Sequence, residues 1–167
     1  MKKLTMCALF VLSANSYSYV EHFNEQQWTT GEGATGAIQI LEEKITPITE
    51  EEKKNFNYNL TARTQGYYGR AGNNITMQGE HGIQISNYTN QRNTYTVNVY
   101  LCALNISCFN NTYSVAVNSG YSYTSRASSL LNSSFKNAGN YTLQAGTRIS
   151  GAENALAYDN KPINVTF

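Results

Sequence analysis

Residues 93–117 constrain the fold more than any other stretch, because they combine strand alternation with two cysteines, Cys102 and Cys108. Apolar and polar residues alternate along the first half of this stretch, which is typical of a β-strand with one buried face. An antiparallel hairpin that places the two cysteines opposite each other fixes every other pair of partners. Its apolar face then pairs Leu101 with Phe109, Val97 with Tyr113, Tyr95 with Val115, and Val99 with the polar Asn111. A shift by one residue would place apolar side chains opposite polar ones, so the cysteines and the alternation predict the same register.

The start of the chain has the layout of a secretory signal peptide. Lys2 and Lys3 precede an apolar run at residues 4–12, and small residues follow it. We expect a signal peptide at residues 1–18, cleaved after Ser16 or Ser18, and hence an exported protein that is periplasmic or secreted. A buried N-terminal helix is the alternative. No segment approaches the roughly 20 apolar residues of a spanning helix, so we expect no membrane span after cleavage.

Export has a consequence for Cys102 and Cys108. Exported proteins lie in oxidising compartments, where two cysteines across a hairpin are most simply a disulfide. The loop that this bridge would close is short, so the chain-entropy model gives it a stabilising effect of only about 2 kcal/mol. We therefore predict a disulfide that holds the tip of the hairpin.

After residue 56 the chain carries short segments of alternating apolar residues, separated by Gly, Asn and Ser. They recur at spacings of about 8–12 residues, and no segment outside the signal keeps a helical period beyond about two turns. This pattern predicts an all-β domain at residues 57–167, an antiparallel sandwich of about 7–9 short strands. Residues 19–56 show little periodicity. We expect an irregular extension there, with a loose first strand as the alternative at residues 19–36, a short strand at 37–41 and a helical turn at 49–55.

Residues 129–131 and 136–143, SLL and KNAGNYTL, resemble the E–F corner of immunoglobulin-like domains. In that family a D-x-G-x-Y-x-C motif places a tyrosine corner at the start of strand F. Asn137 stands where the family has aspartate, and Leu143 stands where it has the second cysteine, which rules out the antibody-type inter-sheet disulfide. The resemblance implies an immunoglobulin-like β-sandwich in which Tyr141 is largely buried. Its hydroxyl would bond a backbone group near residues 136–138.

Residues 157–167, AYDNKPINVTF, resemble the last strand of pilin and spore-coat-U-like subunits. Those subunits also end in a Y-x-D turn, an alternating strand and a terminal aromatic residue, but their C-terminal glycine is not at its usual spacing here. The resemblance implies a structural subunit that assembles by strand exchange. The alternation predicts that Ile163, Val165 and Phe167 face the core, and that Asn164 and Thr166 face outward.

The sequence offers little for catalysis. It contains one aspartate, Asp159, and two histidines, His22 and His81, and no serine lies in a G-x-S-x-G motif. We place His81 in a polar turn and expect no metal site, because no second histidine or cysteine lies at metal-ligand spacing. We also expect no catalytic residues and no cofactor, since no glycine-rich phosphate loop is present. An exported hydrolase of unrecognised type is the alternative.

Charge argues against nucleic acid as a partner. The chain has 12 Lys+Arg, and removal of Lys2 and Lys3 leaves ten of them against 11 Asp+Glu. No basic run is interleaved with aromatic residues. Sequons for N-glycosylation begin at Asn59, Asn74, Asn87, Asn105, Asn110, Asn132, Asn140 and Asn164. We take them to reflect the abundance of Asn, Ser and Thr rather than glycosylation.

One loop has the composition of a binding site. In residues 65–73, QGYYGRAGN, glycines flank Tyr67, Tyr68 and Arg70. These side chains could stack on a sugar or anchor a protein partner, but we favour a glycine-rich turn whose tyrosines cover the edge of the core, because tyrosine is common throughout the chain. We therefore expect a monomeric, non-catalytic protein that acts in binding or adhesion, with an unidentified protein or carbohydrate partner. A pilin-like structural subunit is the alternative.

Overall fold

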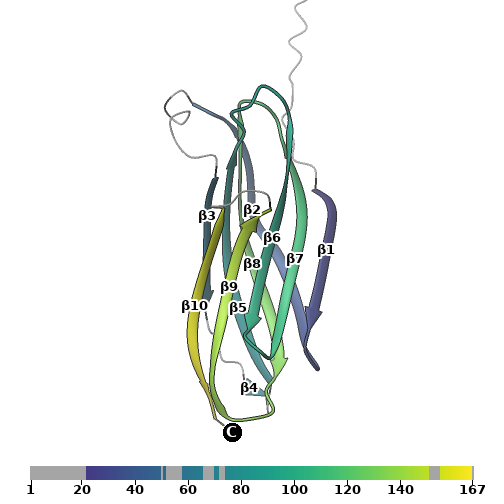
Figure 1. Cartoon of the computed structure of the whole chain (residues 1–167), viewed down its shortest axis with the longest axis vertical. Coiled ribbons are helices and arrows are strands. Elements are labelled where there is room, and N and C mark those ends of the chain that lie inside the picture. Colours follow the sequence, from purple (N-terminus) through teal and green to yellow (C-terminus); the bar gives the residue numbers. More distant parts are fainter. Residues whose placement is uncertain are drawn as a thin grey trace, which may run out of the picture.

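The computed structural model describes residues 22–49, 51, 58–65, 70–71, 74–150 and 155–166. This part of the chain forms ten β-strands and no helix (Figure 1). The strands are β1 His22–Thr30, β2 Thr35–Pro47, β3 Tyr58–Gln65, β4 Arg70–Ala71, β5 Asn74–Ser86, β6 Asn93–Ala103, β7 Ser107–Val117, β8 Tyr121–Ser134, β9 Gly139–Ile149 and β10 Leu156–Val165.

Two antiparallel sheets face each other and form a β-sandwich, which confirms the predicted fold class. The first sheet has five strands in the order β1-β7-β6-β9-β10. The second has the order β2-β8-β5-β3, and the two-residue β4 also pairs with β5. The chain crosses between the sheets after β1, β5, β7 and β8, so both sheets are built from segments distant in sequence.

The β6–β7 hairpin has the predicted register. Cys102 lies opposite Cys108, and a disulfide with a Cα–Cα distance of 4.1 Å joins them. The remaining partners are also as predicted, from Leu101 opposite Phe109 to Tyr95 opposite Val115. The disulfide and the register at the centre of the first sheet are therefore confirmed.

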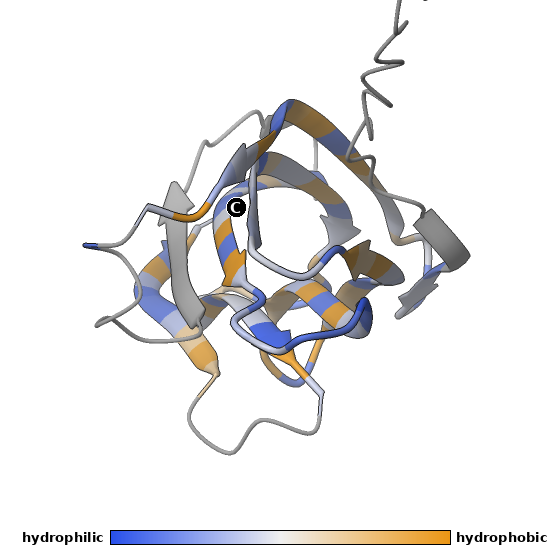
Figure 2. Cartoon of the chain, turned by 90° about the horizontal axis from the view of Figure 1, so that it is seen from above, coloured by the Kyte–Doolittle hydropathy of each residue, from blue (hydrophilic) through white to orange (hydrophobic). Residues whose placement is uncertain are grey.

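Alternation along the strands fills the space between the sheets. Hydrophobic and hydrophilic bands alternate along the ribbon when the molecule is viewed along its strands (Figure 2). The inward side chains form two clusters that include Met77, Leu101, Phe109, Leu131, Phe135 and Leu143 in one and Ile83, Ile85, Val97, Tyr113, Tyr123 and Ile149 in the other. Burial of each large apolar side chain stabilises the fold by roughly 1.5–3 kcal/mol.

The described residues of the N-terminal segment form two strands of the sandwich, so the predicted irregular extension is wrong, whereas the alternative of a first strand and the strand at 37–41 are confirmed. Within it, β1 pairs with β7 and β2 pairs with β8, so each forms an edge of a different sheet. Edge strands need few apolar residues, and a bulge between Ile40 and Glu42 shifts the alternation of β2 by one position. Both effects hide the strand period in the sequence. The expected helical turn at 49–55 lies mostly outside the described residues.

The strands are also longer than predicted. The segments around Ile75 and Ile83 belong to one strand, β5, and the predicted polar turn between them is wrong. Gly79 is a packing glycine rather than a turn glycine, because a Cβ there would lie 2.6 Å from Ser129 Oγ. His81 therefore lies in mid-strand and faces the core, with 2% of its surface exposed.

The C-terminal strand and the connection between β8 and β9 agree largely with what the sequence predicted. Ile163 and Val165 are buried, whereas Asn164 and Thr166 are exposed; Phe167 lies outside the described residues.

The Tyr141 hydroxyl donates to the backbone oxygen of Asn137 at 2.8 Å, as the tyrosine-corner hypothesis predicted. The Tyr141 ring is half-buried rather than largely buried, and it packs edge-on against Phe135 with 4.7 Å between ring centroids.

Candidate functional site

The predicted binding loop lies mostly outside the described residues. Tyr67 and Tyr68 belong to the part of the chain that is not described. Arg70 lies in β4, where its backbone pairs with Ile75. The role of this loop therefore stays a prediction, and the candidate sites that follow lie on the described surface.

Strand pairing places one row of residues directly across the outer face of the five-stranded sheet. From edge to edge this row, which we call the aromatic row, contains Tyr158 on β10, Gly146 on β9, Tyr100 on β6, Asn110 on β7 and Trp28 on β1. Tyr158 is 60% exposed and Trp28 is 47% exposed. Exposed Trp and Tyr side chains are enriched at binding interfaces relative to the rest of protein surfaces.

The central ring of this row lies down on the sheet. A Cβ placed on Gly146 would come within 2.0 Å of Tyr100 Cζ, so the outer half of the Tyr100 ring covers the Gly146 backbone. The ring therefore reaches from β6 across β9 toward Tyr158. Burial raises the pKa of Tyr100 above its ordinary value; the neighbouring Tyr158 acts in the same direction, and Arg148 opposes the change.

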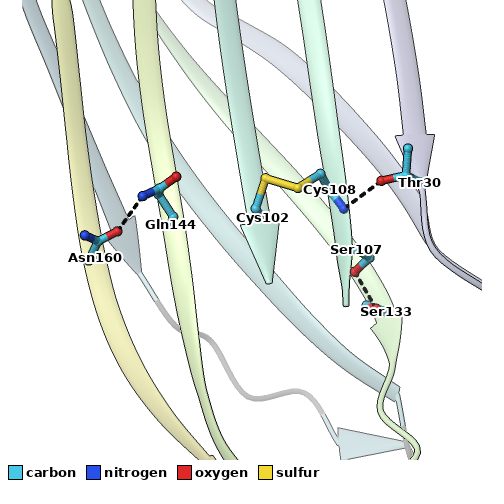
Figure 3. Close-up of a disulfide and its surroundings, with 7 residues drawn as sticks. All are labelled: Thr30, Cys102, Ser107, Cys108, Ser133, Gln144 and Asn160. Atoms are coloured by element: carbon cyan, nitrogen blue, oxygen red, sulfur yellow. Dashed lines mark hydrogen bonds between the residues drawn. A yellow bond between two sulfur atoms is a disulfide. The ribbon is translucent and has the colours of Figure 1, made fainter. Parts of the chain in front are cut away.

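Two rows of mostly uncharged side chains flank the aromatic row. One contains Leu156, Arg148, Asn98, Thr112 and Gln26; the other contains Asn160, Gln144, Cys102, Cys108 and Thr30. Figure 3 shows the second row, which runs from Asn160 through the disulfide to Thr30. Gln144 Nε2 donates to Asn160 Oδ1 at 2.9 Å, and Thr112 Oγ1 donates to Asn98 Oδ1 at 2.6 Å. These bonds hold the amide groups in fixed orientations.

The disulfide supports the centre of this face. Cys102 and Cys108 lie two positions from Tyr100 and Asn110 on the same strands, so the bridge fixes the separation of β6 and β7 beside the aromatic row. The backbone N–H of Cys108 donates to Thr30 Oγ1 at 3.3 Å, which ties the edge strand β1 to the same point. The face is therefore preorganised, which lowers the entropy that a ligand would have to remove.

The outer face of the second sheet differs in composition. Its outward positions on β2 and β8 include Glu42, Lys44 and Arg126, and those on β5 include Glu80. The outward positions of these three strands hold no aromatic residue. By contrast, the three rows on the five-stranded sheet contain a single charged residue, Arg148. Charged side chains are the usual way to keep a sheet face in water, so an aromatic and nearly uncharged face indicates a binding surface.

A hollow at one end of the sandwich is a weaker candidate. It has a volume of about 530 Å³ and is lined by Ile48, Tyr88, Thr89, Asn90, Ser119 and Gly120. The buried Asn87 builds its rim by donating to the carbonyl oxygens of Gln91 and Val117, both at 2.8 Å. Thr89 donates to Asn87, and the Ser119 hydroxyl donates to the Thr89 carbonyl oxygen. The polar groups of this rim are thus used to fold the loop.

His81 is the strongest titratable candidate, but it is enclosed. Its Nε2 lies 2.7 Å from Ser129 Oγ, and its Nδ1 lies 3.1 Å from Thr147 Oγ1. Burial lowers the pKa of His81 to about 4, against a smaller opposing effect of a backbone bond at Gly146. Ser129 and Thr147 are fully buried. A substrate could not reach the buried Ser129–His81 pair, so this pair is not a reaction centre. The contact of His81 with Thr147 instead joins the two sheets.

Two kinds of feature are absent from the described residues. No group of three or more His, Cys, Asp or Glu side chains comes together in a way that could hold a metal ion. No helix in this part of the chain is long and apolar enough to cross a membrane.

Comparison with protein-family models, with curated proteins and with solved structures finds no match. The site must therefore be interpreted from its own chemistry.

Proposed function

We propose that this protein is an exported, non-catalytic β-sandwich that binds its ligand on the outer face of the five-stranded sheet. The observation that carries the proposal is the contrast between the two outer faces. One presents Trp28, Tyr100 and Tyr158 with a single charge among its three rows, and the other presents charged side chains with no aromatic residue at the outward positions of β2, β5 and β8. Exposed Trp and Tyr on a rigid support are typical of binding surfaces. Such a protein would act in the cell envelope or outside the cell, in binding or adhesion.

The strand order supports an immunoglobulin-like version of this fold. From β3 onward, β3, β5 and β8 lie in one sheet and β6, β7, β9 and β10 lie in the other. That is the distribution of strands A, B and E against C, C′, F and G. β2 lies beside β8 and β1 beside β7, where strands D and C″ lie in variable-type domains. The Tyr141–Asn137 bond at the start of β9 is a second point of support.

Sedimentation or size-exclusion of the mature protein tests the alternative of assembly by strand exchange. We expect a stable monomer, and a ladder of polymers would favour a pilin-like subunit. Until then the pilin-like and hydrolase alternatives stay predictions.

The binding proposal is tested by matched variants on the two faces. Trp28→Ala combined with Tyr158→Ala removes the exposed ends of the aromatic row, and Leu130→Ala removes an exposed apolar side chain from the opposite face. Both proteins should keep the parent's urea midpoint. We expect the double variant to lose about tenfold or more in affinity for whichever glycan or extracellular protein the parent binds on an array. A double variant that binds every parent ligand with unchanged affinity contradicts the proposal.

A further inference from the structure

We propose that the aromatic row binds a single chain of a neutral polysaccharide, which lies across the strands rather than along them. This inference rests on the proposed function and specifies its ligand. Three properties of the face carry it: the spacing of its aromatic residues, the chemistry of the flanking rows, and the near absence of charge.

The spacing follows from strand pairing. Tyr158, Tyr100 and Trp28 lie on β10, β6 and β1, with one strand between each pair. Neighbouring strands are about 4.8 Å apart, so the aromatic backbone positions recur about every 9.6 Å over a span of about 19 Å. One strand spacing is close to the length of one sugar unit in an extended β-linked chain. The Tyr100 ring extends from β6 over β9, so the rings themselves are unevenly spaced, and a chain along the row would place about one unit over each strand.

The position of the central ring suits a sugar. The end of the Tyr100 ring lies over the Gly146 backbone, so the ring extends across the surface of the sheet, and the side chain stays partly exposed. The C–H groups of a pyranose ring pack on the face of an aromatic ring, because that π-face is electron-rich.

The flanking rows provide the hydrogen bonds that a sugar needs. Asn98, Thr112 and Gln26 lie on one side of the aromatic row, and Asn160, Gln144 and Thr30 lie on the other. Amide and hydroxyl groups both donate and accept, as sugar hydroxyls do. A ligand that lies along the aromatic row would have at least one such group beside it on every strand of the sheet, with Leu156, Arg148 and the disulfide at the remaining positions.

Charge and twist narrow the ligand class further. Arg148 is the only charged residue in the three rows, so a polymer with a carboxylate or sulfate on each unit would leave most of its charges unpaired. Adjacent strands are rotated by roughly 20–25°, so the row is twisted along its length. A twisted row fits one flexible chain better than the flat surface of a crystalline polymer.

The experiment measures binding of the full mature chain to soluble polysaccharides by affinity electrophoresis, and to oligosaccharides by calorimetry. The neutral probes are mixed-linkage β-glucan, xylan and glucomannan, and the acidic probes are alginate and polygalacturonate. We expect a neutral probe to bind, with affinity that rises with length up to about four or five sugar units, the span of the row. Trp28→Ala and Tyr158→Ala should each weaken binding by about tenfold. The opposite-face control Leu130→Ala should change it by less than about threefold.

The other outcomes separate this inference from the proposed function. Binding of acidic probes only, with loss in Arg148→Gln, overturns the neutral-glycan inference and leaves the binding face intact. Binding of an extracellular-matrix protein that depends on Trp28 and Tyr158, without glycan binding, has the same consequence. Absence of any ligand whose binding depends on these residues overturns both proposals. Tyr100→Phe keeps the ring over Gly146 and should bind like the parent, so a large loss in that variant would contradict stacking by the ring.

Discussion

Acid should weaken this sandwich well above the pH at which its carboxylates titrate, because of His81. The side chain lies between the sheets with 2% of its surface exposed, and its two ring nitrogens face Ser129 and Thr147. One ring nitrogen donates and the other accepts when the imidazole is neutral. A proton added to the ring would leave a buried charge without an acidic partner among these contacts.

The magnitude follows from the shift in pKa. Burial lowers the pKa of His81 from 6.5 to about 4, so the unfolded chain takes up the proton first as the pH falls. The contribution of neutral His81 to the free energy of unfolding is fully present above pH 6.5. It decreases as the pH falls from 6.5 to 4 and changes little below that. The free energy of unfolding should fall by about 2 kcal/mol at pH 5 and about 3 kcal/mol at pH 4.

Urea unfolding between pH 7.5 and 5, followed by fluorescence at constant ionic strength, measures this change. The window lies above the ordinary pKa values of Asp and Glu, so histidine dominates it. His81→Gln cannot titrate and should show nearly constant stability over the window, although it should be less stable than the parent at neutral pH. His22→Gln, which changes the only other histidine, should keep the parent's dependence. An equal slope in the parent and in His81→Gln would refute the reasoning.

Three further predictions follow from the described contacts. A non-reduced digest of the native protein should contain linked Cys102 and Cys108 peptides, and reduction should lower the free energy of unfolding by about 2 kcal/mol; two free thiols would contradict this. Tyr141→Phe removes the bond to a partly water-accessible carbonyl and should cost about 1 kcal/mol in urea unfolding, whereas an unchanged midpoint would count against the tyrosine corner. Gly146→Ala should cost about 1–3 kcal/mol because its Cβ would overlap Tyr100. That loss should largely disappear in a Tyr100→Ala background, and equal losses in both backgrounds would show that the overlap is not its cause.

The sequence predicted the centre of the first sheet correctly because two independent patterns coincided there. The alternation of residues 93–117 and the position of its cysteines allow only one register, and the structure has it. The C-terminal alternation was equally clear at Ile163 and Val165. Local geometry also sufficed for the Tyr141 bond, whose partner lies four positions away.

Prediction failed where long-range contacts decide the conformation. Gly79 and Gly82 on either side of His81 give this segment the composition of a turn. The strand nevertheless continues through both glycines. Gly79 is needed there because the Ser129 side chain of β8 leaves no room for a Cβ. The strands β1 and β2 are edges, where one neighbour and a bulge leave a weak period. Their pairing with β7 and β8 supplies the order that the local sequence does not predict.

The aromatic row could have been found only in part from the sequence. Tyr100 falls on the polar face of β6, in phase with Thr96 and Asn98, and an aromatic residue in that phase is a detectable signal. Trp28 and Tyr158 lie on edge strands far away in the chain, and nothing local indicates that they share a row with Tyr100. Alternation assigns a residue to a face of its own strand, whereas a binding face also depends on which strands are neighbours. The site therefore depends on the pairing of β1 with β7 and of β10 with β9, which brings Trp28 and Tyr158 into one row with Tyr100. A change that shifts the register of either edge strand should weaken binding without removing any contact residue.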